Sequence, residues 1–128
     1  MFLIFFIILS LPFVLLGIER FLPYPYIVEE VGKAFVISLV LRQEKRFNVR
    51  LFTLVVLSAL WFVFIESLLF ALPYKDPVYF TARFIFTGSF HFYTFILFYF
   101  LGKKSRGFKF LSLSIMIISH YIFNLYIR

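Results

Sequence analysis

The sequence predicts an all-α membrane protein: a bundle of about five transmembrane helices that forms a single domain over residues 1–128. Apolar residues make up 63% of the chain and charged residues 15%, whereas a soluble domain is about half apolar and about a quarter charged. The apolar residues gather in runs long enough to cross about 30 Å of hydrocarbon. Polar segments and turn residues separate the runs, as expected of loops. A water-soluble globule and a disordered chain are both excluded.

The first two predicted spans cover residues 2–18 and 27–41. No basic residue precedes the first span and no small-residue cleavage site follows it, so we interpret it as a retained span and not as a signal peptide. The segment Leu22-Pro23-Tyr24-Pro25 then ends the apolar run, because proline interrupts a continuing helix and favours a turn.

The other three predicted spans cover residues 51–71, 78–101 and 108–127. The segments that precede them are polar or rich in turn residues, and they comprise residues 42–50, 72–77 and 102–107. The chain has no cysteine, which excludes disulfides, thiolate metal ligands and a thiol nucleophile.

The distribution of basic residues predicts the orientation of the spans. Lysines and arginines of short loops are retained in the cytoplasm, and the second and fourth loops together hold eight of them, against three on the opposite face. The two sets are Arg42, Lys45, Arg46, Arg50, Lys103, Lys104, Arg106 and Lys109, against Arg20, Lys75 and Arg128. We therefore expect a multi-pass protein of the cell membrane, N-in and C-out. Because the net charge of +7 lies between apolar runs, its partner should be the bilayer and not a nucleic acid.

Polar groups inside the spans mark where function should lie, because an ionisable side chain in hydrocarbon costs at least about 2.5 kcal/mol. The groups are Glu29, Glu30, Lys33, Glu66, Arg83, His91, His120 and Asn124. Counting about 1.5 Å per residue from the outer span ends places Glu30, Glu66 and His120 in the same outer third of the membrane. By the same count His91 lies about 20 Å from Val78 and does not fit this level, unless its helix starts later or tilts.

Each of these groups also has a purely structural interpretation. The two glutamates after Pro25 belong to an expected first helical turn, where acids offset the macrodipole, and Lys33 is an i,i+4 partner for the first of them. Glu66 and Arg83 can form a salt bridge between neighbouring helices. The histidines and Asn124 can hold helices together by hydrogen bonds. The occurrence of such groups on four spans is harder to explain by structure alone.

Among known ways to hydrolyse a peptide bond inside a membrane, these residues favour a water activated by glutamate. A zinc protease of the H-E-x-x-H kind needs two histidines one turn apart, and the chain has no such pair. An aspartyl dyad needs two aspartates, and Asp76 is the only one. Ser89 and His91 lie on one predicted helix, which disfavours a serine nucleophile with a histidine base. The mechanism that remains is a water activated by glutamate, with histidine and amide side chains as partners.

Four short motifs occur in order on successive predicted spans. Glu29-Glu30-Val31-Gly32-Lys33 reads as EExxK and Phe62-Val63-Phe64-Ile65-Glu66 as FxxxE, followed by His91 and then by His120-Tyr121-Ile122-Phe123-Asn124 as HxxxN. Together they resemble the PrsW family of glutamic intramembrane proteases, which is related to the CAAX-processing and bacteriocin-processing membrane proteases. The CAAX-processing and bacteriocin-processing proteases have the motifs EExxxR and FxxxH. Lys33 and Glu66 differ from these motifs and fit the PrsW branch better. Ser67 and Phe95 depart from the family pattern, which has an amide and a small or polar residue there.

The resemblance implies an endopeptidase that cleaves a membrane-anchored protein substrate near the outer face. In this interpretation Glu30 or Glu29 takes a proton from water, and His120 and Asn124 stabilise the oxyanion. Glu66 holds the water or orients His120. Supporting roles fall to Lys33, His91, Phe62 and Arg83.

Three alternatives remain open. No cofactor is expected, but zinc could bind a set of carboxylates and imidazoles consisting of Glu30, Glu66, His91 and His120. A small proton-coupled transporter or channel also uses intramembrane acids, histidines and arginines, although the chain has no internal repeat. A noncatalytic scaffold subunit could keep the same fold.

Overall fold

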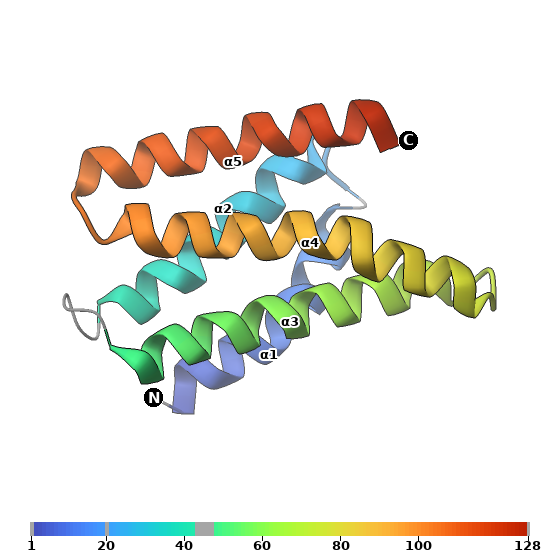
Figure 1. The fold of residues 1–128 in the computed structure, drawn as a ribbon, viewed down its shortest axis with the longest axis horizontal. Coiled ribbons are helices and arrows are strands. Elements are labelled where there is room, and N and C mark those ends of the chain that lie inside the picture. The colour runs from blue at the N-terminus through green and yellow to red at the C-terminus, as the bar shows by residue number, and fades with distance from the viewer. Residues whose placement is uncertain (1, 20, 43–47, 128) are drawn as a thin grey trace.

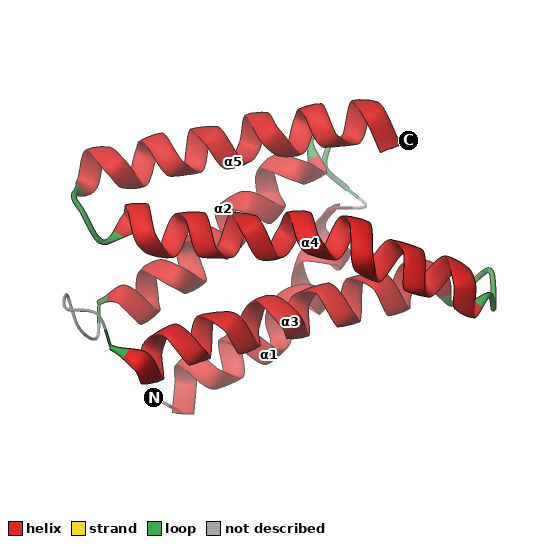
Figure 2. Cartoon of the chain, viewed as in Figure 1, coloured by secondary structure: helices red, strands yellow, loops and turns green. Residues whose placement is uncertain are grey.

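The computed structural model describes residues 2–19, 21–42 and 48–127, and within them the chain forms five α-helices and no strand (Figures 1 and 2). The helices are α1 (Phe2–Glu19), α2 (Pro25–Leu41), α3 (Val49–Ala71), α4 (Pro77–Gly102) and α5 (Arg106–Ile127). The predicted all-α class is confirmed, and each helix begins and ends within two residues of a predicted span. Of the basic residues used to predict the orientation, Arg20, Lys45, Arg46 and Arg128 lie outside the described residues.

Local sequence explains where the helices begin. Pro25 and Pro77 occupy the first turns of α2 and α4, where a missing backbone N–H leaves no hydrogen bond unmade. The side chain of Asn48 caps α3 by accepting hydrogen bonds from two backbone N–H groups. Asp76 caps α4 by accepting a hydrogen bond from the backbone N–H of Val78. Lys75 just before it has a φ of 51°, so the chain reverses tightly between α3 and α4.

Three helices of the described part are long and apolar enough to cross a membrane: residues 49–71, 77–102 and 106–126. In α1 the residues whose side chains the structure describes include the apolar helical stretch Phe5–Ile18. In α2, three charged residues interrupt the first half of a 17-residue helix. By length and composition these three helices are able to cross a membrane, and the count of five spans stays a prediction.

Helix α2 lies at the centre of the bundle and, within the described residues, is the one helix that contacts each of the other four. Helices α3, α4 and α5 run antiparallel to their sequence neighbours, α2 crosses behind α4, and α1 packs behind α3 (Figure 1). The joined ends of α3 and α4 project beyond the ends of α2 and α5 (Figure 1).

The buried face of α2 changes from charged to apolar along the helix. Its first half buries Glu29, Glu30 and Lys33, and its second half buries Ile37 and Val40. The apolar half joins a core whose other large members include Phe62, Phe95, Phe98, Tyr99 and Met116. The same helix thus forms one wall of an apolar core and one wall of a charged cluster.

Helices α3 and α4 approach closely at Gly88, where an added Cβ would lie 2.5 Å from Val63 Cγ1. We expect Gly88→Leu to destabilise the protein by about 1–3 kcal/mol, because the inserted side chain forces these helices apart. Thermal unfolding in detergent, followed by circular dichroism, measures the effect. Gly17→Leu is the matched control, since nothing lies within 4 Å of its added Cβ. Equal unfolding temperatures for the two variants would contradict this packing.

Candidate active site

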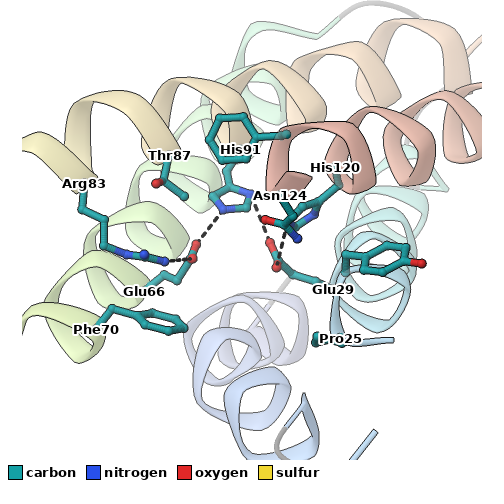
Figure 3. Close-up of a pocket in the computed structure, with 11 residues that line it drawn as sticks. Pro25, Glu29, Glu66, Phe70, Arg83, Thr87, His91, His120 and Asn124 are labelled. Carbon is teal, nitrogen blue, oxygen red and sulfur yellow. Dashed lines mark hydrogen bonds and ion pairs between the residues drawn. The ribbon is translucent and has the colours of Figure 1, made fainter. Parts of the chain in front are cut away.

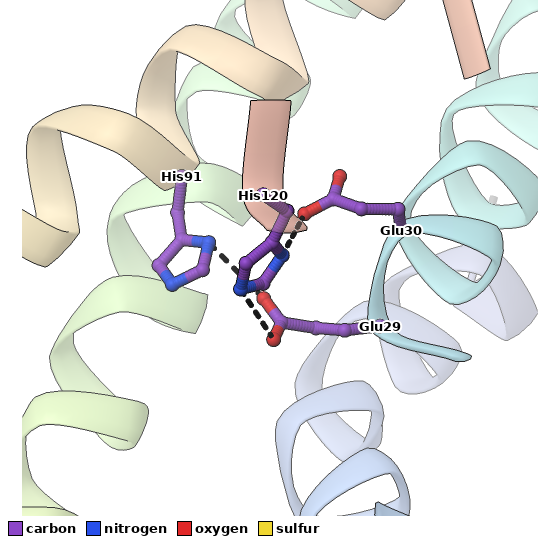
Figure 4. A group of neighbouring side chains, drawn as sticks. All are labelled: Glu29, Glu30, His91 and His120. Carbon is purple, nitrogen blue, oxygen red and sulfur yellow. Dashed lines mark hydrogen bonds and ion pairs between the residues drawn. The ribbon is translucent and has the colours of Figure 1, made fainter. Parts of the chain in front are cut away.

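Six ionisable side chains from four helices meet in one buried cluster, and Figures 3 and 4 show all of them except Lys33. Each is at most 7% exposed, and all six were predicted as candidates: Glu29, Glu30, Lys33, Glu66, His91 and His120. Buried ionisable groups are rare unless they are paired, so their contacts determine what the cluster can do.

Lys33 connects the two glutamates of α2 with the histidine of α4. Its Nζ donates a hydrogen bond to Glu30 Oε1 at 2.9 Å and lies 2.5 Å from Glu29 Oε1. It also lies 2.6 Å from His91 Nδ1. An ammonium has donors only, so Nδ1 accepts this hydrogen bond and the ring proton resides on Nε2. The ammonium therefore fixes the tautomer of His91.

Phe62 supports both of these side chains from α3. The Lys33 ammonium lies 4.8 Å from the centre of the Phe62 ring, a cation–π contact. The ring of His91 meets the same phenyl ring edge-on, with centroids 5.6 Å apart. The Phe62 ring therefore restricts the positions of Lys33 and His91, which is how it could fill its predicted supporting role.

His120 of α5 is held by the second glutamate of α2. Its Nδ1 lies 2.8 Å from Glu30 Oε1, within hydrogen-bond reach. Its Nε2 lies 3.8 Å from Glu29 Oε2, which exceeds hydrogen-bond length. Glu30 therefore orients the imidazole, as a carboxylate does in a catalytic triad.

Glu66 of α3 has two partners: Arg83, as the salt-bridge interpretation expected, and His91 in place of the expected His120. Its Oε1 accepts a hydrogen bond from Arg83 Nη2 at 3.1 Å, which is the interhelical salt bridge. Its Oε2 lies 2.8 Å from His91 Nε2, although neither of these atoms has an aligned hydrogen-bond partner in the described part of the chain. Glu66 thus joins Arg83 to the cluster and does not contact His120 through any of these bonds.

A cavity of about 170 Å³ opens beside the cluster, with room for several water molecules (Figure 3). The candidates that line it are Glu29, Glu66, Arg83, His91, His120 and Asn124. Glu30 is fully buried and does not line the cavity. Of the two adjacent glutamates, only Glu29 can reach a substrate or a water in this space.

His91 lies beside the outer group, which is the exception that the sequence leaves open for a helix that starts later or tilts. Counting from Val78 separates His91 from the outer group, yet it contacts Glu29 and Glu66 directly. The reason is that the first turns of α4 project beyond the ends of α2 and α5 (Figure 1). Helix ends are therefore not level, and distance from an end is a poor measure of position.

Sequence reasoning missed several residues around the histidines. Thr87 lines the cavity one turn before His91, and Tyr26 and Phe123 line it near His120. Phe90 packs edge-on against His120 at 5.3 Å between ring centroids and stacks on Phe123. Aromatic residues make up 24% of the chain, so no sequence signal distinguishes these rings from lipid-facing ones.

The arrangement is suited to acid–base chemistry on a bound water or substrate. A carboxylate faces a polar cavity, and an imidazole backed by a second carboxylate faces the same cavity, which are the elements of general acid–base catalysis. Comparisons of the chain with protein-family models, with curated proteins and with solved structures find no match. What the cluster does must therefore be inferred from its side chains and their geometry.

Proposed function

We propose that the chain is a multi-pass cell-membrane protein with five spans, N-in and C-out, and that it is a glutamate-dependent intramembrane endopeptidase. Its substrate is a membrane-anchored protein cut near the outer face. The observation that carries the proposal is the meeting of Glu29, His120 and Asn124 at one polar cavity. The resemblance of their motifs to those of the PrsW family supports the same reaction.

The proposed reaction is hydrolysis of a peptide bond by a water molecule that Glu29 activates. The Glu29 carboxylate takes a proton from water, and the water oxygen adds to the scissile carbonyl carbon. His120 and Asn124 donate hydrogen bonds to the resulting oxyanion. The proton then passes from the Glu29 carboxyl group to the amide nitrogen, the C–N bond breaks, and a carboxylic acid and an amine are released.

Glu30 acts as a positioning residue in this proposal, which decides between the two glutamates that the sequence left open. Its Oε1 already contacts Lys33 and His120, and its side chain is 0% exposed. Glu66 has an equivalent function for His91, since it faces the ring nitrogen opposite the one that Lys33 occupies.

Cleavage of candidate substrates in cells tests the proposal directly. Single-span membrane proteins with terminal tags are co-expressed with the wild type or with Glu29→Gln, and cleavage products are followed by immunoblot. Asp76→Asn is the matched control, because it removes an exposed carboxylate while asparagine still caps α4. A product seen with the wild type and the control but not with Glu29→Gln supports the protease. Equal products with all three contradict it, and substrate transport without cleavage would support the transporter alternative.

The orientation gives a separate prediction. A reporter active only in the cytoplasm should be silent when fused after Arg128 and active when inserted at Lys45, because the eight basic loop residues favour the cytoplasmic side. Reporter activity in whole cells, corrected for expression level, measures this. The reverse pattern would move the cluster to the cytoplasmic leaflet and place cleavage there.

We expect proteolysis to persist after stringent metal removal, since the proposed reaction needs only a carboxylate and hydrogen-bond donors. The purified protein is treated with a strong chelator and assayed on a verified substrate, alongside a zinc protease in the same detergent. The zinc protease should lose its activity and regain it with zinc. Loss and zinc-dependent recovery in the present protein would replace the glutamic mechanism by a metal mechanism.

A further inference from the structure

Four of the clustered side chains form a set of metal-binding donors. One ligand atom from each of Glu29, Glu30, His91 and His120 lies within 4.8 Å of the others, and all four are buried. Figure 4 shows them pointing toward one another from α2, α4 and α5. Two carboxylates and two imidazoles suit a zinc-like divalent cation. The set differs from the one expected from the sequence, because Glu29 takes the place given to Glu66.

The ammonium of Lys33 already lies among these donors. Its Nζ is 2.5 Å from Glu29 Oε1, 2.9 Å from Glu30 Oε1 and 2.6 Å from His91 Nδ1. These are contacts to three of the four residues that would ligate a metal. A divalent cation bound to the same atoms would lie within a few ångströms of a fixed positive charge, in a region where water does little to screen the repulsion.

The packing leaves the ammonium no open path away from the donors. Lys33 is 0% exposed, and the rings of Phe62 and Phe95 lie 4.8 and 5.8 Å from its Nζ. Both rings also favour a cation at this point. Lys33 is therefore held at the donor set by its surroundings as well as by its charge.

Charge balance indicates which cation could replace the Lys33 ammonium. The two carboxylates and two neutral imidazoles carry two negative charges, of which Lys33 neutralises one. Without Lys33 these charges match a divalent cation. Glu29 Oε1 and Glu30 Oε2 also lack an aligned hydrogen-bond partner among the described residues, so carboxylate acceptors remain for a second ligand.

We propose that Glu29, Glu30, His91 and His120 form a site for a zinc-like divalent cation that the Lys33 ammonium keeps closed. The native chain excludes the metal, and a neutral residue at position 33 opens the site. This inference concerns binding alone and holds or fails independently of proteolysis.

Cobalt(II) is the probe, because its visible absorption reports coordination by protein ligands of this kind. The full-length protein is purified in detergent with a tag that contains no histidine, and is titrated as wild type, Lys33→Met and Lys33→Gln. Lys109→Met is the control for loss of a lysine outside the cluster. His120→Phe combined with Lys33→Met removes one ligand from the opened site.

We expect no coordination band for the wild type and Lys109→Met. Lys33→Met and Lys33→Gln should bind one equivalent of cobalt at least about a hundredfold more tightly than the wild type, as removal of a like charge at this distance requires. His120→Phe should abolish that binding, and excess zinc should displace the cobalt.

Two results would overturn the proposal. One is cobalt binding to the wild type as tight as to the Lys33 variants. The other is that both Lys33 variants, folded by circular dichroism, bind no cobalt. If the variants fold only when zinc or cobalt is present, the metal has replaced the missing charge and the proposal stands. If neither variant folds even with metal, it fails.

Discussion

Glu29→Gln should reduce the rate of substrate cleavage at least about a hundredfold, the lower end of the effect of losing a general base. Glutamine keeps the size of the side chain and its hydrogen-bonding capacity but cannot accept the proton from water. Glu29 also lines the cavity, and no other carboxylate of α2 lines it, so none can take its place there. The rate constant for cleavage of a verified substrate, measured in detergent or in vesicles, tests this.

Glu30→Gln is the informative comparison for this prediction. It should also slow cleavage, because an amide holds the His120 imidazole less firmly by hydrogen bonding than a carboxylate does, but the base on Glu29 would remain. If Glu29→Gln retains activity and Glu30→Gln loses it, Glu30 is the base. If both retain full activity on a verified substrate, the glutamate mechanism is wrong.

The helices could be predicted closely because their signal is local. Each run of apolar residues ends at prolines, glycines or charges, and Pro25, Asn48 and Asp76 begin helices through contacts with their own neighbours. Such interactions depend on a few adjacent residues and need no knowledge of the rest of the fold. The observed ends therefore differ from the predicted ones by at most two residues.

The different positions of Glu29 and Glu30 could not be predicted from such local signals. Adjacent residues on a helix point about 100° apart, so one can face a cavity while the other faces the interior. Which of them does so depends on the rotation of α2 against four other helices. Both glutamates were expected near the site, but only the packed structure gives Glu29 the cavity and Glu30 the contact with His120.

The sequence also could not predict how far α4 is shifted along its own axis relative to its neighbours, and this shift sets the position of His91. Contacts between α3 and α4, including the close approach at Gly88, set how far α4 projects beyond its neighbours. Hydropathy does not carry this information, because a shift of one turn leaves the apolar pattern unchanged. The contacts of Glu66 with both Arg83 and His91 follow from that displacement.

Asn124→Leu should lower the turnover rate about 10²–10³-fold, the usual cost of removing one oxyanion donor. Asn124 lines the cavity one turn after His120 and is only half-buried, so leucine should be accommodated without unfolding α5. Its donated hydrogen bond forms with the oxyanion, so the substitution should reduce kcat and leave KM nearly unchanged.

Tyr121→Phe is the matched control for this change. Tyr121 lies on the same helix and is 48% exposed, and its hydroxyl is not part of the proposed reaction. Both variants should unfold at temperatures close to that of the wild type, so that any difference in rate reflects chemistry. An Asn124→Leu variant with wild-type kcat would remove Asn124 from the reaction and leave His120 to stabilise the oxyanion. A variant whose KM rises while kcat stays constant would instead make Asn124 a substrate-binding residue, because such an interaction is equally strong in the ground state and the transition state.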